Sequence, residues 1–212
     1  MPNWCNNNIT ISGDEGTIRT LTAVLKSIKT SDEEQSNNVF QSLIGLPQHM
    51  SDGDYKEKWY DTNIEWFGTK WDISYSEDMF TFTKDEISFF CETAWSPPIP
   101  FLQHLCEMYK VNANLFYSEG GVGFSGESTF NWVDGELEVY DDECGYLEGI
   151  YKYSREEFWS EVEYRTDCIL DEEQTLEDFI SEFDFVSEED KEELTRLYNE
   201  TIKENDEESE GE

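Results

Sequence analysis

The chain has 212 residues, and 50 acidic against 14 basic side chains give it a formal net charge of −36. Disordered acidic chains are poor in aromatic residues, whereas 15% of this sequence is aromatic. The composition therefore excludes a wholly disordered chain and predicts a folded core. Because so acidic a surface repels nucleic acid and anionic membranes, we expect partners with basic surfaces instead.

Nothing in the sequence marks the chain for export or for a membrane. No run approaches the roughly 18 apolar residues of a membrane span, and the start lacks the basic and apolar regions of a secretory signal. The five cysteines are scattered and form no C-x-x-C pair, which favours reduced thiols over a disulfide framework. We therefore expect a cytoplasmic protein.

The first 140 residues mix strand and helix patterns. Alternating apolar and polar residues predict strands, and apolar residues spaced by three or four predict helices. The predicted strands are 7–12, 72–75, 79–83, 86–93, 113–118, 122–131 and 137–140. The predicted helices are 15–29, 55–67 and 99–109, and a further apolar segment at 39–46 stops at Pro47. This order predicts an α+β domain.

Beyond about residue 150 the pattern changes to helices alone. Ser154 with Glu157 is a capping-box pattern, Thr175 with Asp178 is a looser version, and Ser187 precedes a third apolar stripe. From residue 204 the sequence is dominated by acidic residues, which predicts disorder. We therefore expect three parts: an α+β domain at 1–150, an acidic helical extension at 151–203 and a disordered acidic tail at 204–212.

The negative charge is concentrated in the later part of the chain. Residues 1–133 hold 19 acidic and 8 basic side chains, a net charge of −11. Residues 134–212 hold 31 acidic and 6 basic side chains, a net charge of −25. Acidity that served only solubility or salt adaptation would be spread evenly, so this distribution favours a positioned acidic surface. Unspecific acidity is the alternative.

Four motifs, in this order, resemble the Api92/YubB-type proteins of phages and plasmids. They are Met1-Pro2-Asn3-Trp4-Cys5-x-Asn7, Trp66-Phe67-Gly68-Thr69-Lys70-Trp71-Asp72, Thr93-Ala94-Trp95-Ser96-Pro97-Pro98, and the segment from Tyr117-Ser118-Glu119 to Gly123-Phe124-Ser125-Gly126. The resemblance spans about residues 1–140 and leaves the helices after residue 150 outside it. It implies a mobile-element protein in a bacterial host cell, and it implies no reaction.

The resemblance also implies a ferredoxin-like domain. The expected fold class is therefore α+β, with a ferredoxin-like antiparallel sheet, helices on one face and an acidic helical C-terminal extension. Trp66, Trp71 and Trp95 are interpreted mainly as core packing and turn determinants, because aromatic side chains are usually buried. A recognition groove is the alternative.

Catalytic and metal-binding patterns are weak in this sequence. His104 and Cys106 would point to different faces of a helix, and the other histidine, His49, is about 55 positions away. The acidic clusters Asp52-Gly53-Asp54 and Asp141-Asp142-Glu143 do not fit a calcium-binding loop. We therefore expect no enzyme activity, no catalytic residues, no metal and no cofactor.

The acidic helices suggest DNA mimicry. Carboxylates on neighbouring helical turns lie about 5–6 Å apart, which is similar to the spacing of phosphates along a DNA strand. The expected partner is the basic surface of a host nucleic-acid-binding protein. The predicted partner-binding residues are Glu156, Glu157, Glu161, Glu163, Asp171, Glu172, Glu173, Glu177, Asp178, Glu182, Glu188, Glu189, Glu192 and Glu193.

Mobile-element origin makes a restriction, CRISPR or other defence nuclease the first target to consider, and host RNA polymerase another. The competing interpretation is an interaction adaptor that uses the ferredoxin-like sheet or its aromatic motifs, with the charge incidental. A symmetric homodimer would extend the charged surface, although no interface is legible in the sequence.

Overall fold

The structure is a computed structural model that describes residues 3–28, 38–172 and 174–210, with the side chains of 167–172 and 204–210 left out. It divides the chain into two compact units, Met1–Glu143 and Cys144–Glu212. They are called the N-terminal unit and the C-terminal unit below. The division falls a few residues before the sequence-based boundary at 150.

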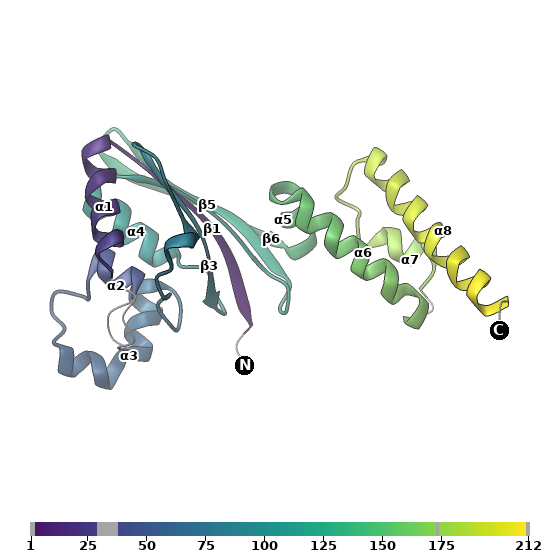
Figure 1. The fold of residues 1–212 in the computed structure, drawn as a ribbon, viewed down its shortest axis with the longest axis horizontal. Coiled ribbons are helices and arrows are strands. Elements are labelled where there is room, and N and C mark those ends of the chain that lie inside the picture. Colours follow the sequence, from purple (N-terminus) through teal and green to yellow (C-terminus); the bar gives the residue numbers. More distant parts are fainter. Residues whose placement is uncertain (1–2, 29–37, 173, 211–212) are drawn as a thin grey trace. The chain divides into compact units, whose positions relative to one another are not determined.

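The N-terminal unit is built on an antiparallel sheet (Figure 1). The strands of the sheet are β1 (Trp4–Ser12), β2 (Phe80–Phe82), β3 (Glu86–Ala94), β4 (Asn112–Glu119), β5 (Phe124–Val133) and β6 (Glu136–Gly145). Their order across the sheet is β2-β3-β1-β4-β5-β6. The first strand of the sequence therefore lies in the interior of the sheet, between β3 and β4.

Helices cover one face of this sheet (Figure 1). They are α1 (Glu15–Ser27), α2 (Val39–Ile44), α3 (Asp52–Phe67) and α4 (Ile99–Tyr109), and a short 3₁₀ turn, η1 (Glu77–Met79), precedes β2. Along β1 the odd-numbered side chains are buried, including Ile9 and Ile11, whereas the even-numbered Asn6, Asn8 and Thr10 are not. This period of two places the core between the sheet and the helices.

Aromatic side chains fill that core where the helices meet. Phe40 of α2 stacks on Phe101 of α4 with ring centroids 4.1 Å apart, and it also contacts Phe67 of α3 at 5.9 Å. All three rings are fully buried. Burial of large apolar side chains is the main favourable term in folding, so these contacts fix the helices on the sheet.

The C-terminal unit consists of α5 (Tyr146–Tyr153), α6 (Arg155–Glu172), α7 (Leu176–Ser181) and α8 (Glu188–Glu210). Phe158 of α6, Phe179 of α7 and Leu194 of α8 are buried together with Phe183. The Phe183 ring lies 5.2 Å from Phe179 and 5.9 Å from Phe158. No helix in the described ranges is long and apolar enough to cross a membrane.

The predicted α+β class, with an antiparallel sheet and a helical C-terminal part, is confirmed. The predicted strand at 72–75 is wrong, because residues there form only an isolated bridge between Ser74 and Asn38. The Asp72 side chain binds the start of α2 instead. The helix α8 continues to Glu210, into the segment expected to be a disordered tail, and the sequence between Ser187 and Gly211 contains no Gly or Pro to stop it.

Candidate functional site

The C-terminal unit exposes carboxylates on three helices. Glu156 and Glu163 are exposed on α6, and their spacing of seven residues places them on one face of that helix. The exposed predicted residues of α7 and α8 are Glu177, Asp178, Glu188, Glu189 and Glu192. Several of these lie in the first turn of their helix, where a negative charge favours the helix dipole. Glu163 and Glu192 lie beyond the first turn, so the dipole does not account for them.

Other predicted acidic residues are engaged within the unit. Glu161 and Glu182 both bind Arg165, at 2.9 and 2.8 Å, which connects α6 to the end of α7. Glu157 accepts a hydrogen bond from the Tyr146 hydroxyl at 3.2 Å. Side chains held this way are oriented by the fold and offer a partner less freedom than the exposed ones.

Two more of the predicted residues pair with bases on their own helix. Glu188 binds Lys191 at 2.9 Å, and Glu193 binds Arg196. Both pairs lie on α8, where exposed ion pairs of this kind contribute little to stability. The side chains of Asp171 and Glu172, and all of Glu173, lie outside the described residues.

Asp190 is the best-connected carboxylate of this unit, although the sequence analysis did not select it. It accepts hydrogen bonds from Arg155 at 2.7 Å, from the Tyr151 hydroxyl at 2.7 Å and from Ser187 at 2.8 Å. These bonds, with Arg155 first, lower the pKa of Asp190 to about 2. Since Arg155 is the first residue of α6 and Asp190 lies on α8, the pair links two of the helices that present exposed carboxylates.

Thr175 and Ser187, which the sequence placed at the starts of helices, act as helix caps in this unit. Thr175 caps α7: its hydroxyl accepts the Asp178 N–H at 3.2 Å and donates to the Asp178 carboxylate at 2.6 Å. Ser187 caps α8 in the same way through Asp190. The sequence signal of Thr with an acidic residue three positions on predicted the Thr175 cap, whereas Ser187 was identified only by the apolar stripe that follows it.

In the N-terminal unit, two of the tryptophan motifs interlock. The Thr69 hydroxyl donates to the Ala94 carbonyl at 3.2 Å and accepts the Ala94 N–H at 3.1 Å. The Ser96 hydroxyl donates to the Gly68 carbonyl at 2.6 Å. A Cβ on Gly68 would lie 2.4 Å from Pro100, so the glycine is required by this close approach. These motif residues are structural.

The tryptophans of the same motifs are not core residues. Trp71 is 38% exposed, Trp95 is 43% exposed and Trp4 is 47% exposed. The interpretation of Trp71 and Trp95 as core packing is therefore wrong, because the interlocked backbone turns their indole rings outward. Of Trp66, Trp71 and Trp95, only Trp66 is half-buried. Its Nε1 donates a hydrogen bond to the Gly45 carbonyl at 3.0 Å.

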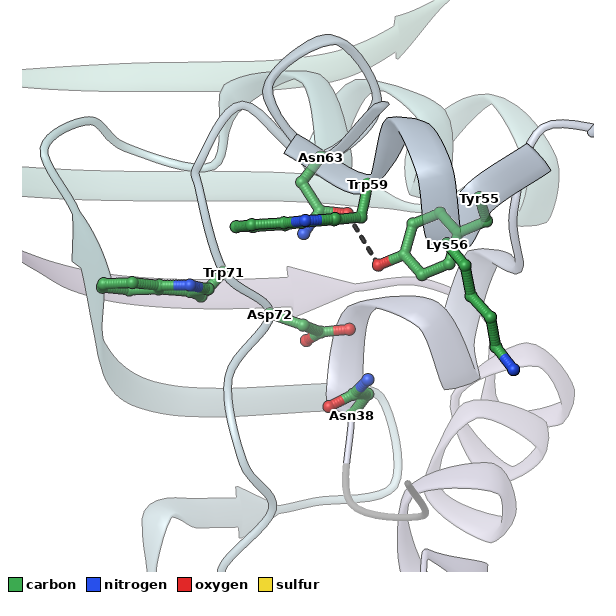
Figure 2. A pocket seen from close by; sticks show the side chains of 7 residues that line it. All are labelled: Asn38, Tyr55, Lys56, Trp59, Asn63, Trp71 and Asp72. Atoms are coloured by element: carbon green, nitrogen blue, oxygen red, sulfur yellow. Dashed lines mark hydrogen bonds between the residues drawn. The ribbon is translucent and has the colours of Figure 1, made fainter. Parts of the chain in front are cut away.

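Trp71 lines a hollow of about 380 Å³ on this unit (Figure 2). The side chains around the hollow are Asn38, Tyr55, Lys56, Trp59, Asn63, Trp71 and Asp72. Tyr55 and Asn63 both lie on α3, and the Tyr55 hydroxyl donates to the Asn63 side chain at 2.9 Å. This bond fixes the two side chains relative to each other. Figure 2 shows the Trp59 and Trp71 rings edge-on, with the Asp72 carboxylate beside them. A second hollow of about 310 Å³ adjoins the first, and Trp71 and Asp72 line both.

Asp72 is a constrained acid. Its carboxylate accepts the N–H groups of Phe40 and Gln41, each at 2.8 Å, and of Ile73 at 2.7 Å. Burial nevertheless raises the pKa of Asp72 to about 6, against the opposing effect of these hydrogen bonds. Sequence reasoning found Asp72 within a motif but missed its role, since the contact with residues 40 and 41 is long-range.

The fourth motif is also structural. Tyr117 is fully buried, and its hydroxyl donates to Asp141 at 3.2 Å. A Cβ on Gly126 would lie 2.4 Å from the Tyr117 oxygen, so this glycine makes room for the ring. The Glu119 carboxylate accepts the N–H groups of Gly121 and Val122 at 2.8 and 2.6 Å and holds the turn between β4 and β5.

The weak catalytic and metal candidates lie in ordinary structural places. His104 stacks on Trp66 with ring centroids 3.9 Å apart. Cys106 is buried, and burial raises its thiol pKa to about 12, which keeps it protonated and unreactive. Asp54 forms a capping box with Ser51 at the start of α3. Within the described ranges, no three His, Cys, Asp or Glu side chains converge as metal ligands.

Comparison with known proteins gives a family and no activity. Residues 70–199 match the family model described as a ferredoxin-like domain in Api92-like protein. The chain is also similar to the crystal structure of a protein api92 from Yersinia pseudotuberculosis, at 9% sequence identity over 69% of this chain and 98% of that chain, with a TM-score of 0.37. No curated protein matches the chain.

The extent of the match differs from the resemblance in the sequence. It continues through α5, α6, α7 and much of α8, so the expectation that the acidic helices lie outside the family is wrong. The last of the four motifs ends at Gly126, so the motifs alone give no sign of the family beyond about residue 140. Since the family model covers more than half of the sequence, the chain belongs to the family of the ferredoxin-like domain in Api92-like proteins.

Proposed function

We propose that the C-terminal unit binds the basic, nucleic-acid-binding surface of another protein, and that it does so by imitating the charge of DNA. The observation that carries the proposal is the set of exposed carboxylates that neither the helix dipole nor an internal ion pair explains. Glu163 and Glu192 are the clearest members.

The charge balance of the unit supports this proposal. Residues 144–212 hold 25 acidic and 6 basic side chains. Five of the six bases pair with acids of the same unit: Lys152, Arg155, Arg165, Lys191 and Arg196. The internal bases therefore leave most of the negative charge available to a partner, and such a field steers a basic surface into contact.

The finer proposal concerns the target. A defence nuclease of the bacterial host, of restriction or CRISPR type, is the favoured partner, and host RNA polymerase is the second. The protein acts without catalysis in this proposal, as a competitor for the nucleic-acid site in the cytoplasm.

A displacement assay tests the proposal. A labelled DNA duplex is bound to a purified restriction endonuclease, a CRISPR effector or RNA polymerase, and the full chain is titrated in while fluorescence anisotropy is followed. The proposal predicts that the duplex leaves at least one of these proteins, and that raising the salt concentration weakens the competition steeply. Retention of the duplex by all three proteins at low salt would overturn it.

The adaptor interpretation is the alternative, and one observation favours it. The N-terminal unit exposes Phe90 on the sheet face opposite the helices, at 48%, beside the exposed Asn8 of β1. A partner bound there would be insensitive to salt. A captured partner whose affinity does not change between low and high salt would therefore favour the adaptor over the mimic.

A further inference from the structure

The N-terminal unit carries a cluster of exposed tryptophans at its two hollows. Trp59 and Trp71 line the first hollow, and Trp4 and Trp71 line the second. Trp59 is 37% exposed, and Trp4 and Trp71 are more exposed. Exposed aromatic clusters of this kind are typical of binding sites rather than of inert surface. The residues that line the two hollows all belong to the N-terminal unit.

The hollow in Figure 2 offers an acceptor that is not fully used. The Asp72 Oδ1 atom accepts two backbone N–H groups, from Phe40 and Ile73, whereas Oδ2 accepts the N–H of Gln41. A carboxylate oxygen accepts about two hydrogen bonds. The backbone N–H of Val39 also acts on this carboxylate, yet burial still disfavours its ionised form. A further donor at Oδ2 therefore stabilises the carboxylate most when it carries a positive charge.

The aromatic walls also favour a cation. The Lys70 ammonium already lies 4.3 Å from the Trp71 ring centroid and 4.8 Å from that of Trp95, so the chain itself uses these rings to hold a positive charge. Lys56, which lines the same hollow, directs its ammonium away from the two indoles in Figure 2. The net charge of −36 further attracts cations.

We propose that this hollow binds the guanidinium group of an arginine side chain from a partner protein, stacked on Trp59 or Trp71 and donating to Asp72 Oδ2. A guanidinium is planar, weakly hydrated and always charged, so it stacks on indole faces better than the compact ammonium of lysine does. The inference goes beyond DNA mimicry, because it uses the other unit and survives if the acidic helices bind nothing.

Asp72 gives the site a pH dependence with a defined sign. The titratable groups that share the two hollows with Asp72, or lie at their rings, are Tyr55, Lys56, Lys70, Cys91 and Glu92. Burial raises the pKa of Asp72 to about 6, while an arginine keeps its charge throughout this range. If only the ionised carboxylate binds, affinity falls about fourfold between pH 7.5 and 5.5.

The test uses N-acetyl-L-arginine amide as the probe and the full chain labelled with ¹⁵N. The indole N–H signals of Trp59 and Trp71 should shift and saturate. N-acetyl-citrulline amide, which has nearly the same shape without the charge, should bind about tenfold more weakly or not at all. Equal binding of citrulline would overturn the proposal, and so would guanosine monophosphate shifting the same signals at lower concentration than arginine does.

Matched variants locate the site. Trp59→Leu should weaken arginine binding about tenfold, and Trp59→Phe, which keeps an aromatic face, should recover part of it. The control is Tyr140→Leu, because Tyr140 is an aromatic residue of the same unit, is 63% exposed and does not line the hollow. Unchanged arginine binding by Trp59→Leu, or an equal loss in Tyr140→Leu, would contradict the assignment.

The same titration separates this inference from the proposed function. A variant with acidic residues of α6, α7 and α8 changed to amides should still bind the arginine probe with the affinity of the original chain. It should no longer displace DNA from a nuclease. Loss of arginine binding in that variant would place the cation site on the helices and would overturn the inference while leaving the proposed function standing.

Discussion

The two units of this chain differ in what their polar side chains contact. In the N-terminal unit they turn inward: the buried Asn7 amide donates to the Cys5 and Cys91 carbonyls and to Thr93. In the C-terminal unit the carboxylates turn outward, as Glu163 and Glu192 do. Residues 1–143 hold 25 acidic and 8 basic side chains, a net charge of −17, and residues 144–212 hold 25 and 6, a net charge of −19. The C-terminal unit has about half as many residues, so the two units differ in the density and placement of their carboxylates and not in their total charge.

The buried acid Glu119 is an example of a carboxylate that contacts its own backbone instead of solvent. It is 2% exposed, and its carboxylate is occupied by two backbone N–H groups of its own turn. Buried polar groups without partners are costly, so an acid in this position serves the backbone. An exposed Glu on α6 or α8 has no such task and remains available to a partner.

The largest expected effect comes from the aromatic core of the C-terminal unit. Phe158→Ala removes a fully buried ring that contacts Tyr151, Trp159 and Phe183, and should lower the free energy of unfolding by about 3–5 kcal/mol. Urea denaturation of the full chain measures it. The control is Tyr164→Ala, because Tyr164 is on the same helix and 65% exposed. Equal losses in both would mean that the acidic helices lack a packed core.

The next effect tests the inward packing of the N-terminal unit. Gly126→Ala brings a Cβ within 2.4 Å of the Tyr117 oxygen and 2.7 Å of the Asp142 carbonyl oxygen, and should cost about 1–3 kcal/mol. The Tyr117 ring carbon Cζ lies 2.6 Å from the same Cβ. Adding Tyr117→Leu removes both clashing atoms and should recover part of the loss in a double-mutant cycle. Gly53→Ala is the control, since its nearest neighbour lies 3.7 Å away. Additivity of the two changes would disprove the contact.

Asp190→Asn tests how the acidic helices are held together. The folded-state pKa of Asp190 is lowered to about 2 by Arg155, Tyr151 and Ser187, so its contribution is present above about pH 4 and is lost as the pH falls through about 2. Because Arg155 is half-exposed, the expected loss at pH 7 is about 1–2 kcal/mol. Thermal unfolding at pH 7 and pH 2.5 should show that the difference between the variant and the original chain becomes smaller in acid. A constant difference between them would contradict this account.

A smaller effect is expected from the hydrogen bonds between Thr69 and Ala94, which join two of the tryptophan motifs. Thr69→Val leaves the Ala94 N–H and carbonyl without the Thr69 hydroxyl, and should cost about 1–2 kcal/mol. Thr20→Val is the control, because its hydroxyl bonds to Gly16 on an exposed helix face. If the two substitutions lower the free energy of unfolding equally in urea denaturation, the Thr69–Ala94 hydrogen bonds make no special contribution to the N-terminal unit.

The smallest effect on stability should come from the surface carboxylates. Changing Glu156, Glu163, Glu177, Glu188, Glu189 and Glu192 to Gln should alter the free energy of unfolding by no more than about 0.5 kcal/mol per site, because these side chains are exposed. Chemical denaturation checks this result. A collective loss of several kcal/mol would show that these acids serve the fold, and the contrast between the two units would fail.

Local signals in the sequence predicted most of the fold. The alternation around Ile9 and Ile11 found β1, and the spacing of Phe101, Leu102 and Leu105 found α4 with the bounds that the structure has. The error at 72–75 arose because Asp72 serves a helix some thirty residues earlier in the chain. The spacing of apolar residues along the sequence does not predict such a long-range contact.

The candidate sites were predictable to different degrees. The exposed carboxylates follow from helix periodicity and charge, so Glu156 and Glu163 were found directly. The hollow was not, because Trp59 and Trp71 meet only through the tertiary fold. The Trp71-Asp72 pair within a motif was a signal. The exposure of its indole, however, depends on the long-range hydrogen bonds between Gly68-Thr69 and Ala94-Trp95-Ser96, which sequence patterns do not describe.

The central claim is that the position of the carboxylates, and not the total charge, makes the C-terminal unit a binding surface. Two variants with the same net charge test it: six Glu→Gln changes on α6, α7 and α8 as above, and six acid-to-amide changes on the N-terminal unit. The second set is Asp61, Glu65, Glu77, Asp78, Glu136 and Glu138, which are all exposed.

The measurement is displacement of labelled DNA from a nuclease that the original chain inhibits, at one fixed salt concentration. The account predicts that the C-terminal variant loses competition by at least about tenfold, while the N-terminal variant stays within about twofold of the original chain. Equal losses in the two variants would contradict it, because they would show that charge alone, wherever it lies, produces the binding.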